Sequence, residues 1–196
     1  MDFIETVLGP EQDRHIDFLT IHPRTRQTPS SIPINLEALE ILTSKYGDRV
    51  PILVSGDVFA MSSLPFTSPL WPKKDKANEQ ATGGIDAFPH LPKLAGLMSA
   101  RAILANPALY AGNDACTWAV VETFMNKVAR APLPLKLVLH HLSEMCAPGL
   151  GPNKESLLSK KERVAMLECT NMIDLIDFID EKIGDRNGHS GLRRDR

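Results

Sequence analysis

The chain has 196 residues, of which 43% are hydrophobic and 23% charged, as in an ordinary globular protein of one domain or one and a half. Its net charge of −2 excludes a globally basic surface, so any contact with nucleic acid must depend on a local patch. The three cysteines form no CxxC pair, and no apolar run is long enough to span a membrane. The acidic start of the chain does not resemble a signal or transit peptide.

The first part of the chain alternates helical and strand patterns. Helices are predicted at residues 2–8, 35–45 (with Asn35 as the cap) and 59–64, and from Asn106-Pro107 onward. Short apolar runs predict buried strands at residues 16–21, 50–54 and 94–98. This order predicts right-handed βαβ units and a parallel sheet.

Three segments of different character define the predicted domains. Residues 1–112 carry the alternating pattern, and within them residues 68–92 are rich in Pro, Lys and Gly without periodicity, which predicts an exposed, mobile insertion. Residues 113–184 carry only helical patterns. Residues 185–196 are charged and contain glycine, which predicts a disordered tail.

The second domain is predicted to be a small helical bundle. Apolar residues recur at helical spacing over about residues 118–128, 135–145 and 173–183. Ser159 and Glu162 have the spacing of a capping box, which predicts the start of a further helix.

Polar clusters follow each of the three predicted strands. They are His22 with Arg24, Ser55-Gly56-Asp57, and Ala100-Arg101. Parallel α/β folds build their sites at the carboxyl ends of strands, where backbone N–H groups can bind phosphate. Gly56 permits close approach of the backbone to a phosphate, and Arg101 can add a charge-assisted hydrogen bond. Each cluster alone also fits a structural role, in which Asp57 caps the next helix and Arg101 is a surface residue.

These residues resemble a known family. Over about residues 2–145 the chain is similar to the C-terminal half of the tRNA-dihydrouridine synthases, through the runs DFLTIHPRTRQ, VPILVSGDV and GLMSARAILANPALYAG. That family has strands ending in His-Gly-Arg-Thr, in Asn-Gly-Asp, and in Gly-Arg-Gly followed by Asn-Pro. The form SARAILANPALYAG and the run KVARAPLPLKLVLHHLSEM resemble the eukaryotic subfamily that modifies D-loop positions 20a and 20b.

The resemblance implies an α/β fold: the C-terminal portion, about three βα units, of an FMN-binding TIM barrel, followed by an α-helical bundle that helps to hold tRNA. It implies a flavin-dependent oxidoreductase that uses NADPH to reduce the C5–C6 bond of a uridine in the tRNA D-loop. The residues it places at the FMN are His22, Ser55, Gly56, Asp57, Ala100 and Arg101. It implies neither a metal nor a membrane partner. A cytoplasmic location is expected, with nuclear and organellar locations left open.

The chain departs from the family in four places. Pro23 and Ala100 replace glycines, and Ser55 replaces an asparagine; alanine at position 100 is acceptable only with a negative φ. The family's catalytic Cys, in an Asn-x-Gly-Cys-Pro context, has no counterpart, because all three cysteines lie in the helical part. We therefore expect a fragment that is inactive alone, binds FMN weakly or not at all, and is poorly soluble because its strands lack barrel partners.

Two other interpretations fit the sequence. One is a non-catalytic tRNA-binding or assembly module on a degenerate half barrel, with the basic residues Lys154, Lys160, Lys161, Arg163, Arg193, Arg194 and Arg196. The other is a generic phosphate-binding βα fragment. Binding of tRNA with a steep dependence on salt supports the first, and a lack of selectivity for flavin supports the second.

Overall fold

The computed structural model describes residues 2–71, 89–151 and 154–186. It divides into two units, Met1–Ala100 and Arg101–Arg196. The division falls before residue 112, where the sequence predicts the domain boundary, because the helix that follows the last strand belongs to the second unit.

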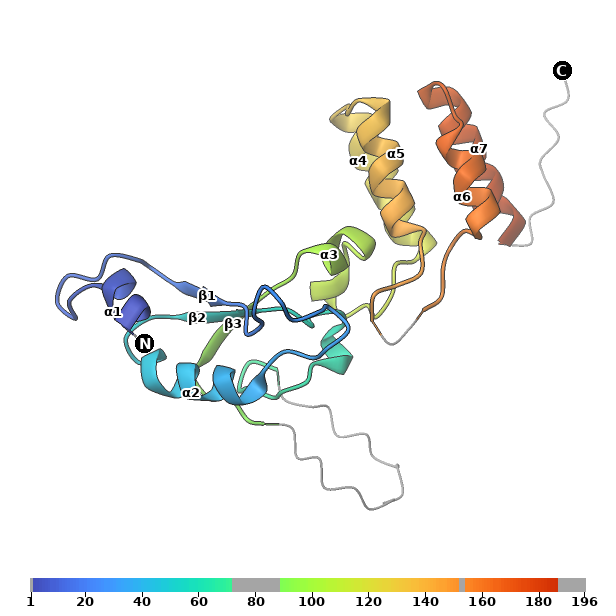
Figure 1. Ribbon diagram of the computed structural model, residues 1–196. Coiled ribbons are helices and arrows are strands. Elements are labelled where there is room, and N and C mark those ends of the chain that lie inside the picture. Colours follow the sequence, from blue (N-terminus) through green and yellow to red (C-terminus); the bar gives the residue numbers. More distant parts are fainter. Residues whose placement is uncertain (1, 72–88, 152–153, 187–196) are drawn as a thin grey trace, which may run out of the picture. The chain divides into compact units, whose positions relative to one another are not determined.

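The first unit contains a parallel sheet of three strands in the order β1-β2-β3, which confirms the predicted parallel sheet (Figure 1). The strands are β1 (Leu19–Ile21), β2 (Ile52–Ser55) and β3 (Leu94–Met98). The third strand has the predicted bounds. The first is shorter than the predicted residues 16–21, because pairing begins where the Leu19 N–H donates to the Pro51 carbonyl, and Phe18 is exposed.

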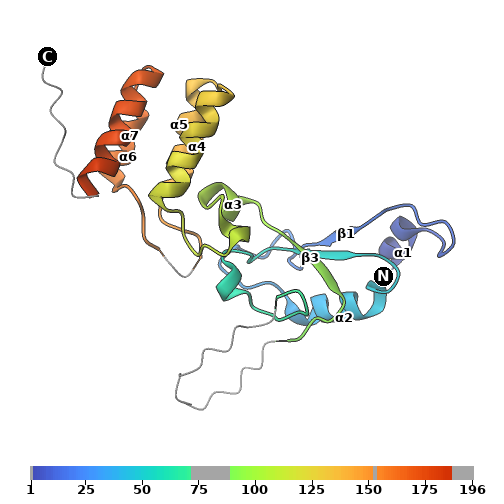
Figure 2. The same ribbon diagram turned by 180° about the vertical axis from the view of Figure 1, so that it is seen from behind.

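Helix α2 (Leu36–Tyr46) lies along one face of this sheet (Figures 1 and 2). Leu39 of α2 and Ile52 and Val54 of β2 are fully buried, which identifies this face as the core of the unit. Asn35 caps the helix as predicted, since its side-chain oxygen accepts a hydrogen bond from the Ala38 N–H at 2.8 Å.

The other face of the sheet is partly open. Leu53 and Gly96 are paired in register on this face, and an ideal Cβ atom at Gly96 would lie 2.9 Å from the Leu53 side chain. At the carboxyl end of the same face, Met98 is 46% exposed. Parallel sheets are usually covered on both faces. The exposed part of this face therefore resembles a surface against which other elements normally pack.

Short helical segments precede and follow the strands. Helix α1 (Asp2–Leu8) has the predicted bounds and ends at Gly9, which has a φ of 76°. The short helix predicted at residues 59–64 is a single 3₁₀ turn, η1 (Met61–Ser63).

The two described ends of the predicted insertion at residues 68–92 are paired with each other, and each end has one buried residue beside exposed ones. The Leu91 N–H donates to the Thr67 carbonyl at 2.8 Å, and Thr67 and His90 form a β-bridge. Ser68 and Leu91 are buried. The two ends are thus held together in the first unit, and residues 72–88, on which the rest of the prediction falls, lie outside the described residues.

The second unit contains helices only, within its described residues 101–151 and 154–186. They are α3 (Arg101–Ala105), the 3₁₀ turn η2 (Leu109–Ala111), α4 (Trp118–Arg130), α5 (Leu135–Met145), α6 (Lys160–Leu167) and α7 (Met172–Arg186). The helix predicted to start at Asn106-Pro107 instead starts at Arg101. Asn106 follows its end, where the buried amide donates to the Asn113 carbonyl and accepts from the Ala108 N–H, so it forms a turn.

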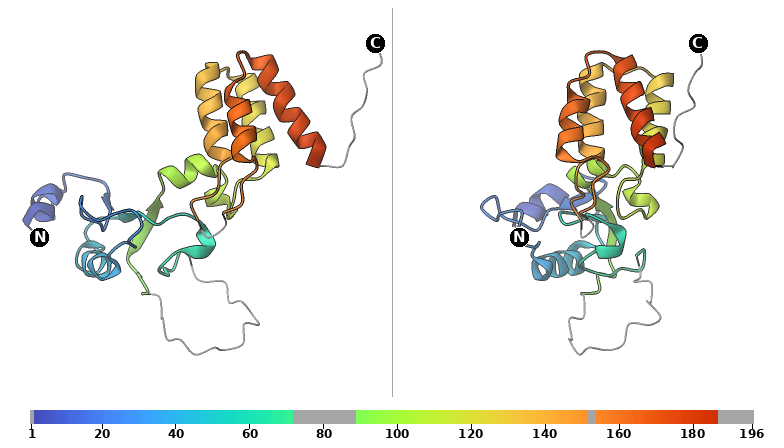
Figure 3. Two further views of the ribbon diagram at one scale, coloured as in Figure 1. Left: turned by 45° about the vertical axis from the view of Figure 1, so that its right-hand side comes forward. Right: turned by 90° about the vertical axis from the view of Figure 1, so that its right-hand side faces the viewer.

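Helices α4 to α7 lie side by side (Figure 3). All four contribute residues to one hydrophobic cluster. Its most buried members include Val121, Val138, Leu142, Met166 and Leu175. The predicted capping box of α6 is confirmed: Ser159 accepts from the Glu162 N–H, and the Glu162 carboxylate accepts from the Ser159 N–H. Of the predicted tail at residues 185–196, the first two residues end α7 and the remainder lies outside the described residues.

Candidate functional site

The strand register places two of the predicted polar clusters, at His22 and at Ser55-Gly56-Asp57, at one edge of the sheet. Ile21 pairs with Val54, and Ser55 pairs with Met98. His22, which follows β1, and Gly56, which follows β2, therefore leave the sheet at the same level. The carboxyl edge of a parallel sheet is where this fold class builds its binding sites.

The His22 ring lies against Gly56. An ideal Cβ atom at Gly56 would be 2.7 Å from the His22 ring and 2.9 Å from the Ile34 side chain, so no other residue fits without displacing them. Gly56 also has a φ of 98°, which disfavours any side chain. His22 itself is exposed, so one side of its ring is accessible to a ligand.

Asp57 does not cap a helix, so that alternative is wrong. The 3₁₀ turn η1 has Ala60 as its N-cap residue and no side-chain hydrogen bond at the cap. The Asp57 carboxylate instead forms an ion pair with Arg24 at 2.7 Å and accepts the Ile34 N–H at 2.8 Å. Asp57 has a φ of 55°, a conformation that Asp and Asn tolerate better than most residues. The sequence places Arg24 in a cluster with His22, but no local pattern identifies its partner.

Of the third predicted cluster, Ala100 is the last residue of the first unit and Arg101 the first residue of the second. Ser99, which the sequence did not single out, donates from its hydroxyl to the Val58 carbonyl at 3.1 Å and so links the ends of β2 and β3. Among the described residues Asp57 is the only non-glycine residue with a positive φ, so Ala100 satisfies the condition set for alanine there. Arg101 is the exposed first residue of α3 in the second unit, and its place in a phosphate site stays a prediction.

The three cysteines lie in the second unit and are poor nucleophiles. Burial raises the pKa of Cys116 to about 11 and that of Cys146 to about 12, and burial also raises the pKa of Cys169. At neutral pH all three thiols are therefore protonated, whereas a reactive cysteine needs a lowered pKa.

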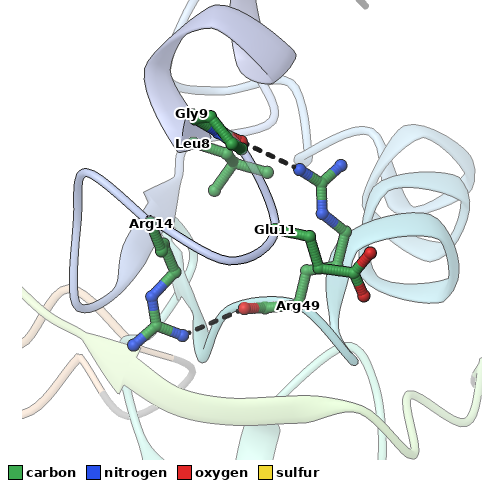
Figure 4. Close-up of a pocket in the computed structure, with 6 residues that line it drawn as sticks. Leu8, Gly9, Glu11, Arg14 and Arg49 are labelled. Atoms are coloured by element: carbon green, nitrogen blue, oxygen red, sulfur yellow. Dashed lines mark hydrogen bonds between the residues drawn. The ribbon is translucent and has the colours of Figure 1, made fainter.

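A small hollow lies at the opposite, amino edge of the sheet (Figure 4). Its volume of about 20 Å³ is enough for one water molecule. Arg49 donates to the Gly9 carbonyl and accepts, through its own carbonyl, a hydrogen bond from Arg14. These bonds hold α1 and the segment before β1 in place. Because the hollow is small and its arginines bind backbone, we place the candidate site at the carboxyl edge.

The basic residues that the tRNA-binding alternative requires are only partly available. Lys160 and Lys161 are exposed, but Lys154 donates to the Gly149 and Leu150 carbonyls, and Arg163 donates to the Leu158 carbonyl. The three terminal arginines lie outside the described residues.

The described residues contain no cluster of His, Cys, Asp and Glu able to hold a metal ion. Within the same residues, none of the helices is both long and apolar enough to cross a bilayer.

The fold and the site define a parallel βα protein whose polar residues gather at the carboxyl ends of its strands. The chain is 34% identical over 171 residues to a Saccharomyces cerevisiae protein named tRNA-dihydrouridine(20a/20b) synthase, a match that covers 86% of this chain and 39% of that relative. A Schizosaccharomyces pombe protein of the same name is 28% identical over 84% of this chain and 41% of its own length. The chain belongs to the tRNA-dihydrouridine synthase family.

A Homo sapiens protein named as similar to the same enzyme is 21% identical over 86% of this chain and 43% of its own length. The names of all three relatives include NAD(P)+. The chain thus spans about two fifths of the length of the curated relatives it matches. No family model and no solved structure matches it.

Proposed function

We propose that this chain forms the flavin-phosphate side of a tRNA-dihydrouridine synthase, as the C-terminal part of a TIM barrel with its helical domain. The observation that carries the proposal is the contact between His22 and Gly56 at the carboxyl edge of a parallel sheet, in a chain whose relatives bear that name. The partly open face of the sheet, with Met98 46% exposed, suits strands that complete a barrel with others.

The residues of the carboxyl edge fit a flavin phosphate. Gly56 lets the backbone turn with a positive φ against the His22 ring, His22 offers an exposed ring, and Ser55 offers a half-buried hydroxyl. The negative charge of Asp57, which on its own repels a phosphate, is compensated by Arg24. We assign the cofactor site to the predicted set, namely His22, Ser55, Gly56, Asp57, Ala100 and Arg101.

When bound, FMN supplies the hydride that reduces the C5–C6 bond of a tRNA uridine, with NADPH as the source of electrons. We propose that this chain holds the phosphate end of FMN and so orients the cofactor. The helical domain is proposed to help bind tRNA. The proposed location of the protein is the cytoplasm. None of its three cysteines has the Asn-x-Gly-Cys-Pro context of the family's catalytic Cys, so the proton for the uridine is proposed to come from a residue outside this chain. Alone, the chain is proposed to be inactive and to bind FMN weakly or not at all.

A chimera tests this proposal. This chain replaces the matching segment of the Saccharomyces cerevisiae relative, and the chimera is expressed in yeast that lacks that relative. The dihydrouridine content of tRNA is measured by mass spectrometry, and FMN is measured by the visible spectrum of the purified chimera. We expect dihydrouridine to be restored, and His22→Ala and Arg101→Ala to lower FMN occupancy.

The control is Lys160→Ala, an exposed residue of α6 outside the proposed flavin site. It is expected to leave FMN occupancy unchanged. A folded chimera without flavin, or one whose flavin is insensitive to His22→Ala and Arg101→Ala, contradicts the proposal.

A further inference from the structure

We infer that Arg24 and Asp57 are positioning residues: together they hold the segment between β1 and α2 so that the His22 ring lies against Gly56. The inference rests on the proposed function, in which His22 and Gly56 contact the flavin. The two residues are 33 positions apart in the sequence and come from the ends of neighbouring strands.

The ion pair between them is well shielded from solvent. Arg24 Nη2 lies 2.7 Å from Asp57 Oδ1, and the two side chains are only 9% and 14% exposed. A pair in this setting is screened little by salt. Removal of one partner leaves the other with an uncompensated charge, so neither residue can be replaced without a structural response.

The pair holds the segment between β1 and α2 at several points. Asp57 Oδ2 accepts the Ile34 N–H at 2.8 Å, near the end of the segment. Arg24 donates from Nε to the Ile32 carbonyl at 3.0 Å and from Nη2 to the Ser30 carbonyl at 3.4 Å. The segment has no helix or strand of its own, so these bonds satisfy backbone groups that a regular element would otherwise pair.

The backbone groups that Arg24 and Asp57 hold belong to the segment whose side chains contact Gly56. Ile34 and His22 are the two side chains closest to the Cβ position of Gly56, at 2.9 and 2.7 Å. Ile34 is held through its N–H by Asp57, which follows Gly56 in the chain. Arg24 lies two residues after His22. Each side of the contact between His22 and Gly56 is therefore fixed by one member of the pair.

Neither member is suited to contact a phosphate directly. Both Asp57 oxygens already accept hydrogen bonds, and the carboxylate has the same sign of charge as a phosphate. Arg24 directs its Nε and Nη2 to two carbonyls of its own segment and to Asp57. The pair acts through His22 and Gly56, so the part that we infer for Asp57 in the proposed flavin site is an indirect one.

Nuclear magnetic resonance of the isotope-labelled full chain tests the positioning. The variants are Asp57→Asn, Arg24→Lys and the control Glu5→Gln. Asn tolerates the positive φ of position 57 and keeps an acceptor oxygen, so Asp57→Asn removes mainly the charge. We expect the Ile34 amide to exchange about tenfold faster in Asp57→Asn, and the nuclear Overhauser effect between the His22 ring and the Ile34 methyl to disappear.

Arg24→Lys keeps the charge without the forked donor and is expected to give an intermediate result. Glu5→Gln alters the exposed ion pair at the other edge of the sheet and is expected to change neither signal. Unchanged Ile34 exchange and an unchanged Overhauser effect in Asp57→Asn overturn the inference.

The same variants in the yeast chimera connect the positioning to flavin. FMN affinity is expected to fall about tenfold in Asp57→Asn and to stay unchanged in Glu5→Gln. Faster Ile34 exchange with an unchanged FMN affinity overturns the role at the flavin site. A wild-type chimera that binds no FMN overturns the proposed function instead, and the resonance signals then decide on their own whether the pair holds the segment.

Discussion

The two edges of the sheet in the first unit contain the same combination of a glycine and a histidine. At the amino edge, Gly9 has a φ of 76° and its ideal Cβ position is 2.7 Å from the His15 ring. At the carboxyl edge, Gly56 has a φ of 98° and its ideal Cβ position is 2.7 Å from the His22 ring. Contact between glycine and imidazole thus does not mark a binding site by itself. The position at the carboxyl ends of the strands distinguishes the second pair.

Each edge also has one arginine–carboxylate pair of nearly equal length. Arg49 lies 2.6 Å from Glu5, and Arg24 lies 2.7 Å from Asp57. The side chains of the first pair are 28% and 41% exposed, and those of the second are 9% and 14% exposed. The comparison teaches that the distance within an ion pair says little about its effect, because burial determines what its loss costs.

The largest expected effect is that of Asp57→Ala, which leaves the shielded Arg24 without a counter-charge. We expect the first unit to lose about 3 kcal/mol of unfolding free energy. Each unit contains one tryptophan, Trp71 in the first and Trp118 in the second. Urea unfolding in a Trp118→Phe background therefore reports on the first unit. Glu5→Ala is the matched change at the amino edge and is expected to cost clearly less; equal losses contradict the comparison.

The next effect is that of alanine at the two glycines. Gly9→Ala and Gly56→Ala each place a side chain at a positive φ and against a histidine ring, so each is expected to cost about 2 kcal/mol. The two variants should thus be similar in urea unfolding. Only Gly56→Ala should lower the FMN affinity of the chimera. A comparable loss of FMN affinity in Gly9→Ala argues against a site confined to the carboxyl edge.

A change in the second unit tests whether the first unit, which contains the sheet, unfolds independently of the helices. Ser159→Ala removes the capping box of α6 and is expected to cost about 1 kcal/mol. The loss should be visible in the unfolding of Trp118, with Trp71 unaffected. Ser159→Thr retains a capping hydroxyl and serves as the control. A shift of the Trp71 transition in Ser159→Ala shows instead that the two units unfold together.

The smallest effect is the pH dependence of the amino edge. A hydrogen bond from Arg49 lowers the pKa of Glu5 from its usual 4.5, so the ionised form stabilises the fold. This contribution is complete above the unfolded-state pKa and is lost as the pH falls through the lower folded-state pKa. Wild-type chain and Glu5→Gln should therefore differ slightly in urea midpoint at neutral pH and coincide in strong acid. High salt at neutral pH should also remove the difference.

Local patterns predicted much of the fold. The bounds of β3, the Asn35 cap and the capping box at Ser159 each depend on residues within a few positions of one another, and all three are confirmed. The prediction for Asn106-Pro107 was wrong because a turn and a helix start share the same local pattern. The buried amide of Asn106, bonded to a carbonyl seven residues away, decided between them.

The candidate site was predictable only in part. The strand-end positions of His22 and Gly56 follow from the alternation of helices and strands, which fixes where each strand ends. The pairing of Arg24 with Asp57 does not follow, because it joins residues 33 positions apart and depends on which strands are neighbours. From local sequence alone, the structural alternative for Asp57 was a helix cap, because a cap needs only backbone N–H groups a few residues away.

The two consecutive positive φ values after β2 limit which amino acids evolution or mutagenesis can place there. Position 56 must lack a side chain, and position 57 must both tolerate the left-handed conformation and carry a negative charge. Glycine and aspartate alone meet these demands together. In a library of all single substitutions selected for a folded product, these two codons should be the least variable of the segment.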